Sequence, residues 1–519
     1  MGFNFMHMRW TLIFIIFFNA SYNIVGQNFF SDNIDLVGFS DAAWQIAEKD
    51  GNYYIVTTSF CDLSPYRCIG LIKLNSDFSI DWRKTIEKTR IDQFTCIAVT
   101  DSCVLLAGRL LQPTDSLEIT VLKIDFEGNT IAQWYYGNAM NNTSFGIAAS
   151  YDNGFVFLYD ENNQSNIENT YMVRCDADGD ILWQKEIEQE FTSSRLYSIH
   201  ATPDSAYVLG MYGCMETNCN EMEGFVVKIN DNGDQVFKIA RDTTSTPGRE
   251  NTYATYTKDD GAVFSRLEEA QPGVWDRQVL YRVDKTANQL WEYHYDAGDY
   301  HRLWSIKEMR NGDILAVGFN EDHPYIDTTD EYLRYWGGWL IRLSPTGEKK
   351  WERIIGDLRY PGDSFGEILD VVEADDGSLA AVGTIIDTFP NAIPAPYNRD
   401  VWLLHLDSMG CIHPGCTGIF QGITGTSKTI NLSWEEADFS IFPNPAKDRV
   451  SVSLSSYTFF DDLTFIMTDQ TGRIMIEKKW PPGQNKYILN TGLLPSGLYF
   501  ITLVSRDGIY GTKKLFIQN

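Results

Sequence analysis

The chain has 519 residues, of which 44% are hydrophobic, so it has enough apolar surface for a large core and is not globally disordered. Its formal net charge is −28, which excludes a protein that holds nucleic acid on a basic face, because phosphate backbones require clustered Lys and Arg. The length allows two or three domains, or one repeat array followed by a smaller domain.

The N-terminus has the features of a secretory signal peptide. Arg9 supplies the positive charge, and the apolar run from Leu12 to Phe18 is too short to cross a bilayer. Cleavage after Gly26 leaves Gln27 as the first residue of the mature chain. We therefore expect residues 1–26 to be a signal peptide, and the mature chain to be exported without a membrane span.

One short phrase recurs seven times between residues 27 and 416. A basic residue lies between aliphatic neighbours, a turn residue that is usually Gly follows five positions later, and a large apolar residue, usually Trp, follows nine positions later. The basic positions are Lys73, Lys123, Arg174, Lys228, Arg282, Arg342 and His405. Before each phrase, Asp or Asn followed by Gly or Ser marks a tight hairpin turn. Repeats of about 40–50 residues built from short strands are typical of β-propellers.

We therefore predict an all-β fold with a seven-bladed β-propeller over residues 27–416 and four strands in each blade. The blades are expected at residues 42–88, 92–138, 143–190, 195–241, 250–297, 302–356 and 365–414. The seventh blade lacks a good fourth strand, so we expect residues 28–39 to complete it and close the ring. The tight turns fall on one face of the disk. The long connections fall on the other, which is the candidate functional face.

Nine Cys follow the signal, and an exported chain meets an oxidising compartment in which disulfides form. Four pairs are close enough in sequence for local bridges, namely Cys61 and Cys68, Cys96 and Cys103, Cys214 and Cys219, and Cys411 and Cys416. Cys175 occupies a position that is aliphatic in the other repeats, and we expect a buried free thiol there.

Three motifs resemble chemical sites, and each has a structural alternative that we favour. Residues 362–366 match the G-x-S-x-G pattern of a nucleophile elbow, but a strand is expected after them in place of the required helix. Residues 176–180 and 230–234 resemble the start of a calcium loop but lack its final Glu, so a hairpin turn explains them. We expect no cofactor, with calcium as the alternative.

The recurring basic residues and the histidines are the other candidates. The basic side chains form either a ring of anion ligands or, as we favour, stems packed between blades with their charges paired to turn acids. His294, His301 and His323 lie near acidic residues in blades five and six, but no metal-binding spacing supports a site, and we expect no metal.

Aromatic residues concentrate in and beside the long connections of blades five to seven. Rings offer flat apolar faces to sugars or peptides, although they also serve to pack loops against the disk. The candidate ligand-binding residues are Tyr295, Tyr300, His301, Tyr325, Tyr332, Tyr335, Trp336 and Tyr360. No catalytic residue is assigned.

After a linker over residues 417–437, the pattern changes to strands without the propeller phrase. Residues 438–519 resemble the type A C-terminal sorting domain of the type IX secretion (Por) system of Gram-negative bacteria. The resemblance rests on residues 439–445, 469–473, 494–500 and 513–519. It implies a small Ig-like β-sandwich that the translocon recognises and a sorting peptidase removes. The sorting residues that it implies are Pro443, Asn444, Pro445, Gly472, Gly497, Tyr499, Lys513 and Lys514.

The repeats themselves are similar to the delta-60 and quinoprotein-like repeats found in passengers of this system. We therefore expect a binding or scaffold module, secreted or held on the outer cell surface after passage through the periplasm, whose ligand is a protein or a glycan. The alternative is a surface enzyme, either polysaccharide-active or quinoprotein-like.

Overall fold

The structure is a computed structural model. It describes residues 30–34, 41–60, 67–89, 96–111, 117–138, 142–162, 168–187, 193–214, 222–239, 252–268, 277–295, 301–320, 337–357, 366–386, 399–412, 415–416, 420–423, 439–454, 464–469, 474–480, 486–492, 494–505 and 508–518. The regular elements within these ranges are all strands. They contain no helix long and apolar enough to cross a membrane.

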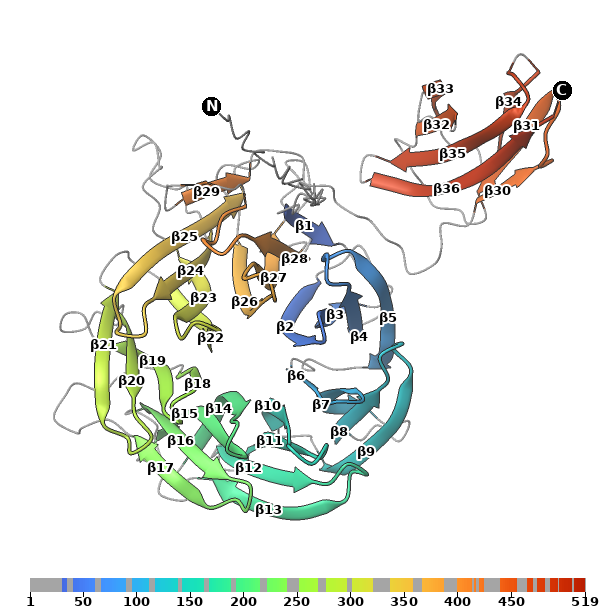
Figure 1. Ribbon diagram of the computed structural model, residues 1–519. Helices are drawn as coiled ribbons and strands as arrows, with labels where there is room; N and C mark the ends of the chain where they lie inside the picture. Colours follow the sequence, from blue (N-terminus) through green and yellow to red (C-terminus); the bar gives the residue numbers. More distant parts are fainter. Residues whose placement is uncertain are drawn as a thin grey trace, which may run out of the picture.

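Seven sheets from the described part of residues 30–423 follow one another around a ring, as Figure 1 shows. In the first six, four antiparallel strands follow chain order from the centre outward. The strands of blades one to three are β2 (Ala42–Lys49), β3 (Asn52–Phe60), β4 (Arg67–Leu74), β5 (Ile80–Thr89), β6 (Cys96–Val99), β7 (Val104–Leu111), β8 (Leu117–Ile124), β9 (Thr130–Asn138), β10 (Asn142–Ala149), β11 (Phe155–Asn162), β12 (Glu168–Cys175) and β13 (Ile181–Ile187). Those of blades four to six are β14 (Ser193–Ala201), β15 (Ala206–Cys214), β16 (Met222–Asn230), β17 (Gln235–Ile239), β18 (Ala254–Tyr256), β19 (Ala262–Glu268), β20 (Arg277–Val283), β21 (Gln289–Tyr295), β22 (His301–Glu308), β23 (Ile314–Asn320), β24 (Gly337–Leu343) and β25 (Lys349–Asp357). The predicted propeller fold is confirmed.

The seventh sheet closes the ring with a strand from the N-terminal end. Its order is β26 (Gly366–Glu373), β27 (Leu379–Ile386), β28 (Arg399–Leu406) and then β1 (Phe30–Ile34). β1 runs antiparallel to β28, with Phe30 opposite His405 and Ile34 opposite Val401. The prediction that the segment at residues 28–39 supplies the missing outer strand is therefore confirmed for residues 30–34, and the rest of the segment lies outside the described residues.

A further strand lies inside the segment expected as a linker. β29 (Phe420–Ile423) pairs in parallel with β25, so the sixth sheet has five strands. The sequence of this short strand has no alternation long enough to mark it, and its pairing depends on the open edge of blade six. Just before it, Cys411 and Cys416 form a disulfide with 5.8 Å between their Cα atoms.

The core of the propeller lies between its blades. Each of the seven junctions holds one cluster of buried apolar side chains, such as the cluster between blades three and four that includes Leu158, Tyr207 and Phe225. An eighth cluster belongs to the C-terminal unit. Burial between faces of adjacent sheets explains why nearly continuous apolar strands recur in the second and third strands of the blades.

The recurring glycine and tryptophan meet across these junctions. Trp82 of blade one packs on the turn of blade two, where its indole N–H donates to the carbonyl oxygen of Phe126 at 3.2 Å. Gly128 in that turn has φ +81°, and a Cβ there would lie 2.8 Å from the Trp82 ring. Trp183 and Trp291 make the same bond, each at 2.9 Å, to the turns of blades four and six. In these turns glycine is favoured for its backbone angle and for its lack of a side chain.

The free thiols correct one expectation. Cys96 and Cys103 are both buried and unbridged, because Cys96 lies opposite Ala107 in the β6–β7 hairpin while Cys103 lies in the turn at its other end. Cys175 is buried and free, as predicted. Cys61 and Cys219 lie outside the described residues, so the pairs that contain them are not described.

The C-terminal unit is a sandwich of two sheets around its own core. One sheet has the order β30 (Phe439–Phe442), β31 (Arg449–Leu454) and β34 (Lys486–Asn490). The other has the order β33 (Ile474–Lys479), β32 (Thr464–Asp469), β35 (Gly497–Ser505) and β36 (Gly508–Ile517). Phe439, Val450, Phe465 and Leu515 are fully buried between them.

Candidate binding site

The innermost strands of four blades are irregular at the same level of the ring. The register shifts between Ala43 and Gln45 in β2, Leu196 and Ser198 in β14, Leu303 and Ser305 in β22, and Ile368 and Asp370 in β26. The extra residues are Trp44, Tyr197, Trp304 and Leu369. Bulges of this kind re-aim a side chain out of the regular strand pattern and are common beside functional sites.

Three aromatic rings from adjacent blades form a continuous arc. Tyr253, immediately before β18, lies between Tyr197 of blade four and Trp304 of blade six. Its ring centroid is 5.4 Å from that of Tyr197 and 6.0 Å from that of Trp304, the latter in an edge-on contact. All three rings are partly exposed. Tyr253 precedes its inner strand, whereas Tyr197 and Trp304 lie near the middle of β14 and β22.

Glu367 of blade seven extends this aromatic arc and is itself buried. Burial raises the pKa of its carboxyl group to about 7, and the positive charge of Arg399 and the nearby Trp304 only partly offset this. Around the middle ring, burial raises the pKa of Tyr253 well above 10, while Arg302 and Arg195 act in the opposite direction. We call Tyr197, Tyr253, Trp304 and Glu367 the mouth arc; arginines flank it.

Beside the mouth arc, the inner strands line an open cavity of about 280 Å³. Tyr197 lines it together with His200, Lys307 and Asp370. Asp370 binds three groups, namely the Ile46 backbone N–H at 3.2 Å, the Ser305 hydroxyl at 2.7 Å and the Lys307 ammonium at 3.2 Å. These contacts join blades six, seven and one. Burial and the nearby Lys307 charge lower the pKa of His200 well below 6.5, so it is neutral at neutral pH.

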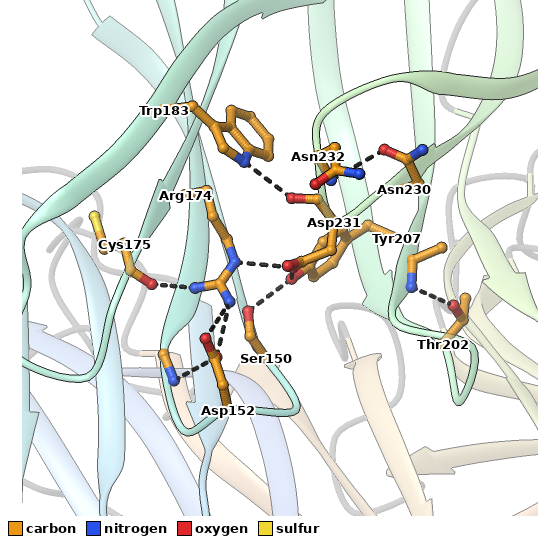
Figure 2. Close-up of polar contacts among 12 residues, drawn as sticks. Ser150, Asp152, Arg174, Cys175, Trp183, Thr202, Tyr207, Asn230, Asp231 and Asn232 are labelled. Atoms are coloured by element: carbon orange, nitrogen blue, oxygen red, sulfur yellow. Dashed lines mark hydrogen bonds and ion pairs between the residues drawn. The ribbon is translucent and has the colours of Figure 1, made fainter.

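The recurring basic residues serve the junctions between blades, and the favoured structural interpretation is confirmed. Figure 2 shows Arg174 between Asp152 of its own blade and Asp231 of the next, at 2.7 and 2.8 Å. Tyr207 also donates to Asp231, at 2.9 Å. Lys228, Arg282 and Arg342 likewise reach carbonyl groups in the turns of the following blades.

The turns that resemble calcium loops are closed by their own first residues. Asp176 accepts from the backbone N–H groups of Asp178 and Asp180, and Asn230 does the same for Asn232 and Asp234. This is the hairpin geometry expected from their sequence. After the G-x-S-x-G pattern, Gly366 opens β26, so a strand stands where an elbow requires a helix.

Two of the sequence-predicted ligand residues are described, and both lie inside blade six and its junction. Tyr295 is 7% exposed and donates to Glu352 at 2.6 Å. His301 is 3% exposed, and its ring accepts from the Gln278 backbone N–H at 3.3 Å. Both rings are therefore buried among neighbouring strands. Tyr300, Tyr325, Tyr332, Tyr335, Trp336 and Tyr360 lie outside the described residues.

The sequence analysis missed the mouth arc, although a signal for it exists. Tyr197, Tyr253 and Trp304 each stand seven residues before the first residue of the tight turn in their blade. A position counted from a fixed turn and aromatic in three consecutive repeats indicates rings at one level of the disk. Glu367 stands nine residues before its turn and shares that place with Arg195 and Arg302.

The sorting residues hold the two ends of the C-terminal unit together. The Asn444 side chain donates to the Lys514 carbonyl oxygen at 2.8 Å and accepts from the Phe516 backbone N–H at 2.9 Å. Pro443 and Pro445 follow cis peptide bonds. Gly497 opens β35, Tyr499 donates to the Pro495 carbonyl oxygen at 2.9 Å, and Lys513 lies over the Phe439 ring. Gly472 is outside the described residues.

Comparison with known families agrees with this geometry. Residues 440–518 match the family described as the secretion system C-terminal sorting domain. This unit is a type IX sorting domain. The chain is therefore a substrate for export by the type IX machinery, as the sequence resemblance implied.

The propeller is similar in fold to several solved structures at low identity. A protein of unknown function from Dyadobacter fermentans is 11% identical, with 72% of this chain and 98% of that chain covered and a TM-score of 0.42. The propeller domain of the Trilobed protease from Pyrococcus furiosus is 12% identical, with 70% and 95% covered and a TM-score of 0.42. Phage phi92 endosialidase is 10% identical, with 96% and 90% covered and a TM-score of 0.44. A search of curated proteins found no match.

Proposed function

We propose that the exported propeller is a surface glycan-binding module whose ligand lies on the mouth arc. The observation that carries this proposal is the row of three partly exposed rings from three adjacent blades, flanked by Glu367 and by arginines. Aromatic faces pack against the C–H surface of sugar rings, while carboxyl and guanidinium groups bind hydroxyls. A row of rings that crosses three blades suits an extended polysaccharide ligand.

The long connections belong to the same proposal. Residues 321–336 join the second and third strands of blade six, and a connection of this kind opens on the face where the inner strands begin. Tyr325, Tyr332, Tyr335 and Trp336 belong to this connection and remain proposed ligand contacts. In this proposal the mature protein acts at the outer cell surface or after release from it.

The test is binding of the purified mature chain to an array of neutral and uronic-acid-containing polysaccharides. Trp304→Ala and Tyr253→Ala should each weaken binding at least about tenfold, because truncating a central aromatic contact typically has this effect or more. Tyr151→Ala is the matched control, since Tyr151 is an exposed ring beside a tight turn on the other face. Equal binding by all four proteins, or equal losses in the control, would refute the site.

One observation favours a second function at the same place. A carboxyl group with a pKa of about 7 is poised to donate a proton at neutral pH, as a general acid in glycoside cleavage does. Glu367→Gln separates the two functions. The readout is release of reducing sugar ends from the polysaccharide that the chain binds. A binding module releases none, whereas an enzyme releases them and loses this activity in the variant.

A further inference from the structure

The sorting domain presents an unusual row of side chains on the outer face of its smaller sheet. Phe442 of β30 lies opposite Ser451 of β31, and Ser451 lies opposite Ile488 of β34. Residues directly opposite in antiparallel strands point to the same face. Phe442 is 76% exposed and Ile488 is 60% exposed, whereas Val450 and Val452 on the other face are fully buried. Two large apolar side chains therefore stand on either side of a serine.

Ser451 belongs to a row of serines, which we call the serine floor, and Phe442 and Ile488 are the walls on its two sides. Ser453 continues it, opposite Ser440 on one side and Lys486 on the other. The Ser451 hydroxyl oxygen is buried and has no hydrogen-bond partner among the described residues. The serine floor is therefore a shallow depression between the larger Phe442 and Ile488 side chains.

Positive charge borders the depression at both ends. Arg449 lies in the register row before Ser451 and Lys486 in the row after it, and both are exposed. The whole domain shares this charge, since residues 439–519 contain nine Lys and Arg against six Asp and Glu. The preceding 438 residues contain 33 against 64. The sorting domain is therefore a basic unit carried by a strongly acidic passenger.

We propose that the row Phe442–Ser451–Ile488 is the surface by which the sorting domain docks on a component of the type IX secretion machinery. The partner chemistry that fits is an apolar side chain seated on the serine floor, flanked by Asp or Glu that pair with Arg449 and Lys486. A domain whose function is to be recognised must expose its recognition contacts, and exposed Phe and Ile add nothing to its own core. The opposite charges also provide electrostatic steering toward an acidic partner.

The first test is surface display of the full chain in the bacterium that makes it. The double variant Phe442→Ser/Ile488→Ser should lower the signal of antibody labelling on intact cells at least about tenfold, with folded full-length chain accumulating in the periplasm. The control is Ile466→Ser, which removes an outward-facing apolar side chain from the other sheet. Normal display of the double variant, or an equal loss in the control, overturns the proposal.

Two further variants keep the proposal testable if the double variant misfolds. Ser451→Tyr fills the floor and leaves both walls in place, and Arg449→Glu/Lys486→Glu reverses the charges at exposed positions. Both should reduce display while the melting temperature of the purified chain stays within about 2 °C of the original. If the face instead binds a second copy or the chain's own acidic propeller, the variants will change the hydrodynamic radius of the purified chain and leave display intact. That outcome overturns the docking proposal. It does not test glycan binding by the mouth arc.

Discussion

At the scale of single residues, Glu367 differs most from its behaviour in water. Its carboxyl group is buried where the inner strand of blade seven begins, and burial favours the neutral form. The folded chain therefore holds a proton at Glu367 between about pH 4.5 and pH 7, where the unfolded chain has released it. Linkage then requires that stability decrease as the pH rises through this window.

We expect Glu367→Gln to remove this loss. The amide is neutral at every pH, so the variant should be more stable than the original chain at pH 8, by up to about 3 kcal/mol for a displacement of this size. At pH 5 the two chains should be nearly equal. Chemical unfolding at both pH values measures the difference. Parallel pH profiles for the two chains would show that Glu367 is ionised in the folded state.

At the scale of elements, each blade is joined to the next by one repeated contact, in which a tryptophan of one outer strand covers a turn of the following blade. Two junctions depart from this pattern, and in each of them both sides of the contact differ. Blade four supplies Phe237 in place of Trp, and the facing turn of blade five has Ala287 in place of Gly, at φ +65°. Blade seven has no Trp strand, and the turn of blade one has Phe78 at the glycine position, at φ +62°.

Phe78 takes the space that a tryptophan occupies at the other junctions. Its ring is stacked on Tyr53 at 4.7 Å and lies 3.8 Å from the ring of His405, the basic position of blade seven. We therefore expect Phe78→Gly to destabilise the chain by about 2 kcal/mol or more, although its backbone angle favours Gly, because the lost burial exceeds the relieved strain. Ala287→Gly is the control and should be close to neutral. A stabilising effect of Phe78→Gly in thermal unfolding would contradict this.

Glycine at the regular junctions can be tested in the same way with a matched pair. Gly179 and Gly377 have similar angles, φ +87° and φ +82°. A Cβ at Gly179 would lie 2.3 Å from the Trp134 ring, whereas nothing lies within 4 Å of one at Gly377. Gly377→Ala should cost about 1–2 kcal/mol of backbone strain, and Gly179→Ala about 1–3 kcal/mol more from overpacking. Equal losses in urea unfolding would mean that Trp134 moves away without cost.

Some of these elements could be predicted from the sequence and others could not. The Asp-Gly turns and the recurring phrase predict the blades, and the missing Trp strand of blade seven predicts β1, because both signals are local and repeated. β29 could not be predicted, since its four residues form a strand only against the open edge of β25. The mouth arc was missed because its rings lie in a register set by bulges, and the search followed the loops. Cys96 and Cys103 are close in sequence, but the hairpin places them at opposite ends.

At the scale of the whole molecule, the chain is a closed ring with a separate sorting domain at its end. Each blade packs against its two neighbours, and β1 supplies the outer strand of the seventh. The seventh blade alone depends on segments from both ends of the propeller. Stability of the ring should therefore depend strongly on a segment of only five residues, β1.

Deleting residues 27–34 should remove β1 and leave the seventh blade without its outer strand. Five residue pairs of the β1–β28 ladder are lost, which corresponds to about 3–5 kcal/mol at the usual net value of a backbone hydrogen bond, and the edge of β28 becomes free to pair with other chains. We expect a lower melting temperature and concentration-dependent aggregation by light scattering. Deleting only residues 27–29 is the control. A melting temperature equal to that of the control would show that β1 contributes nothing to closure.

The antiparallel pairing of β1 with β28 brings the two ends of the propeller together. Phe30 lies opposite His405, so the start of the first strand and the end of the last are neighbours in one sheet. For the same reason the ring tolerates circular permutation in principle. Joining residue 416 to residue 30 and opening a tight turn elsewhere preserves four strands in each blade and the turn of blade seven that Arg342 reaches, with new ends wherever a fused cargo is wanted.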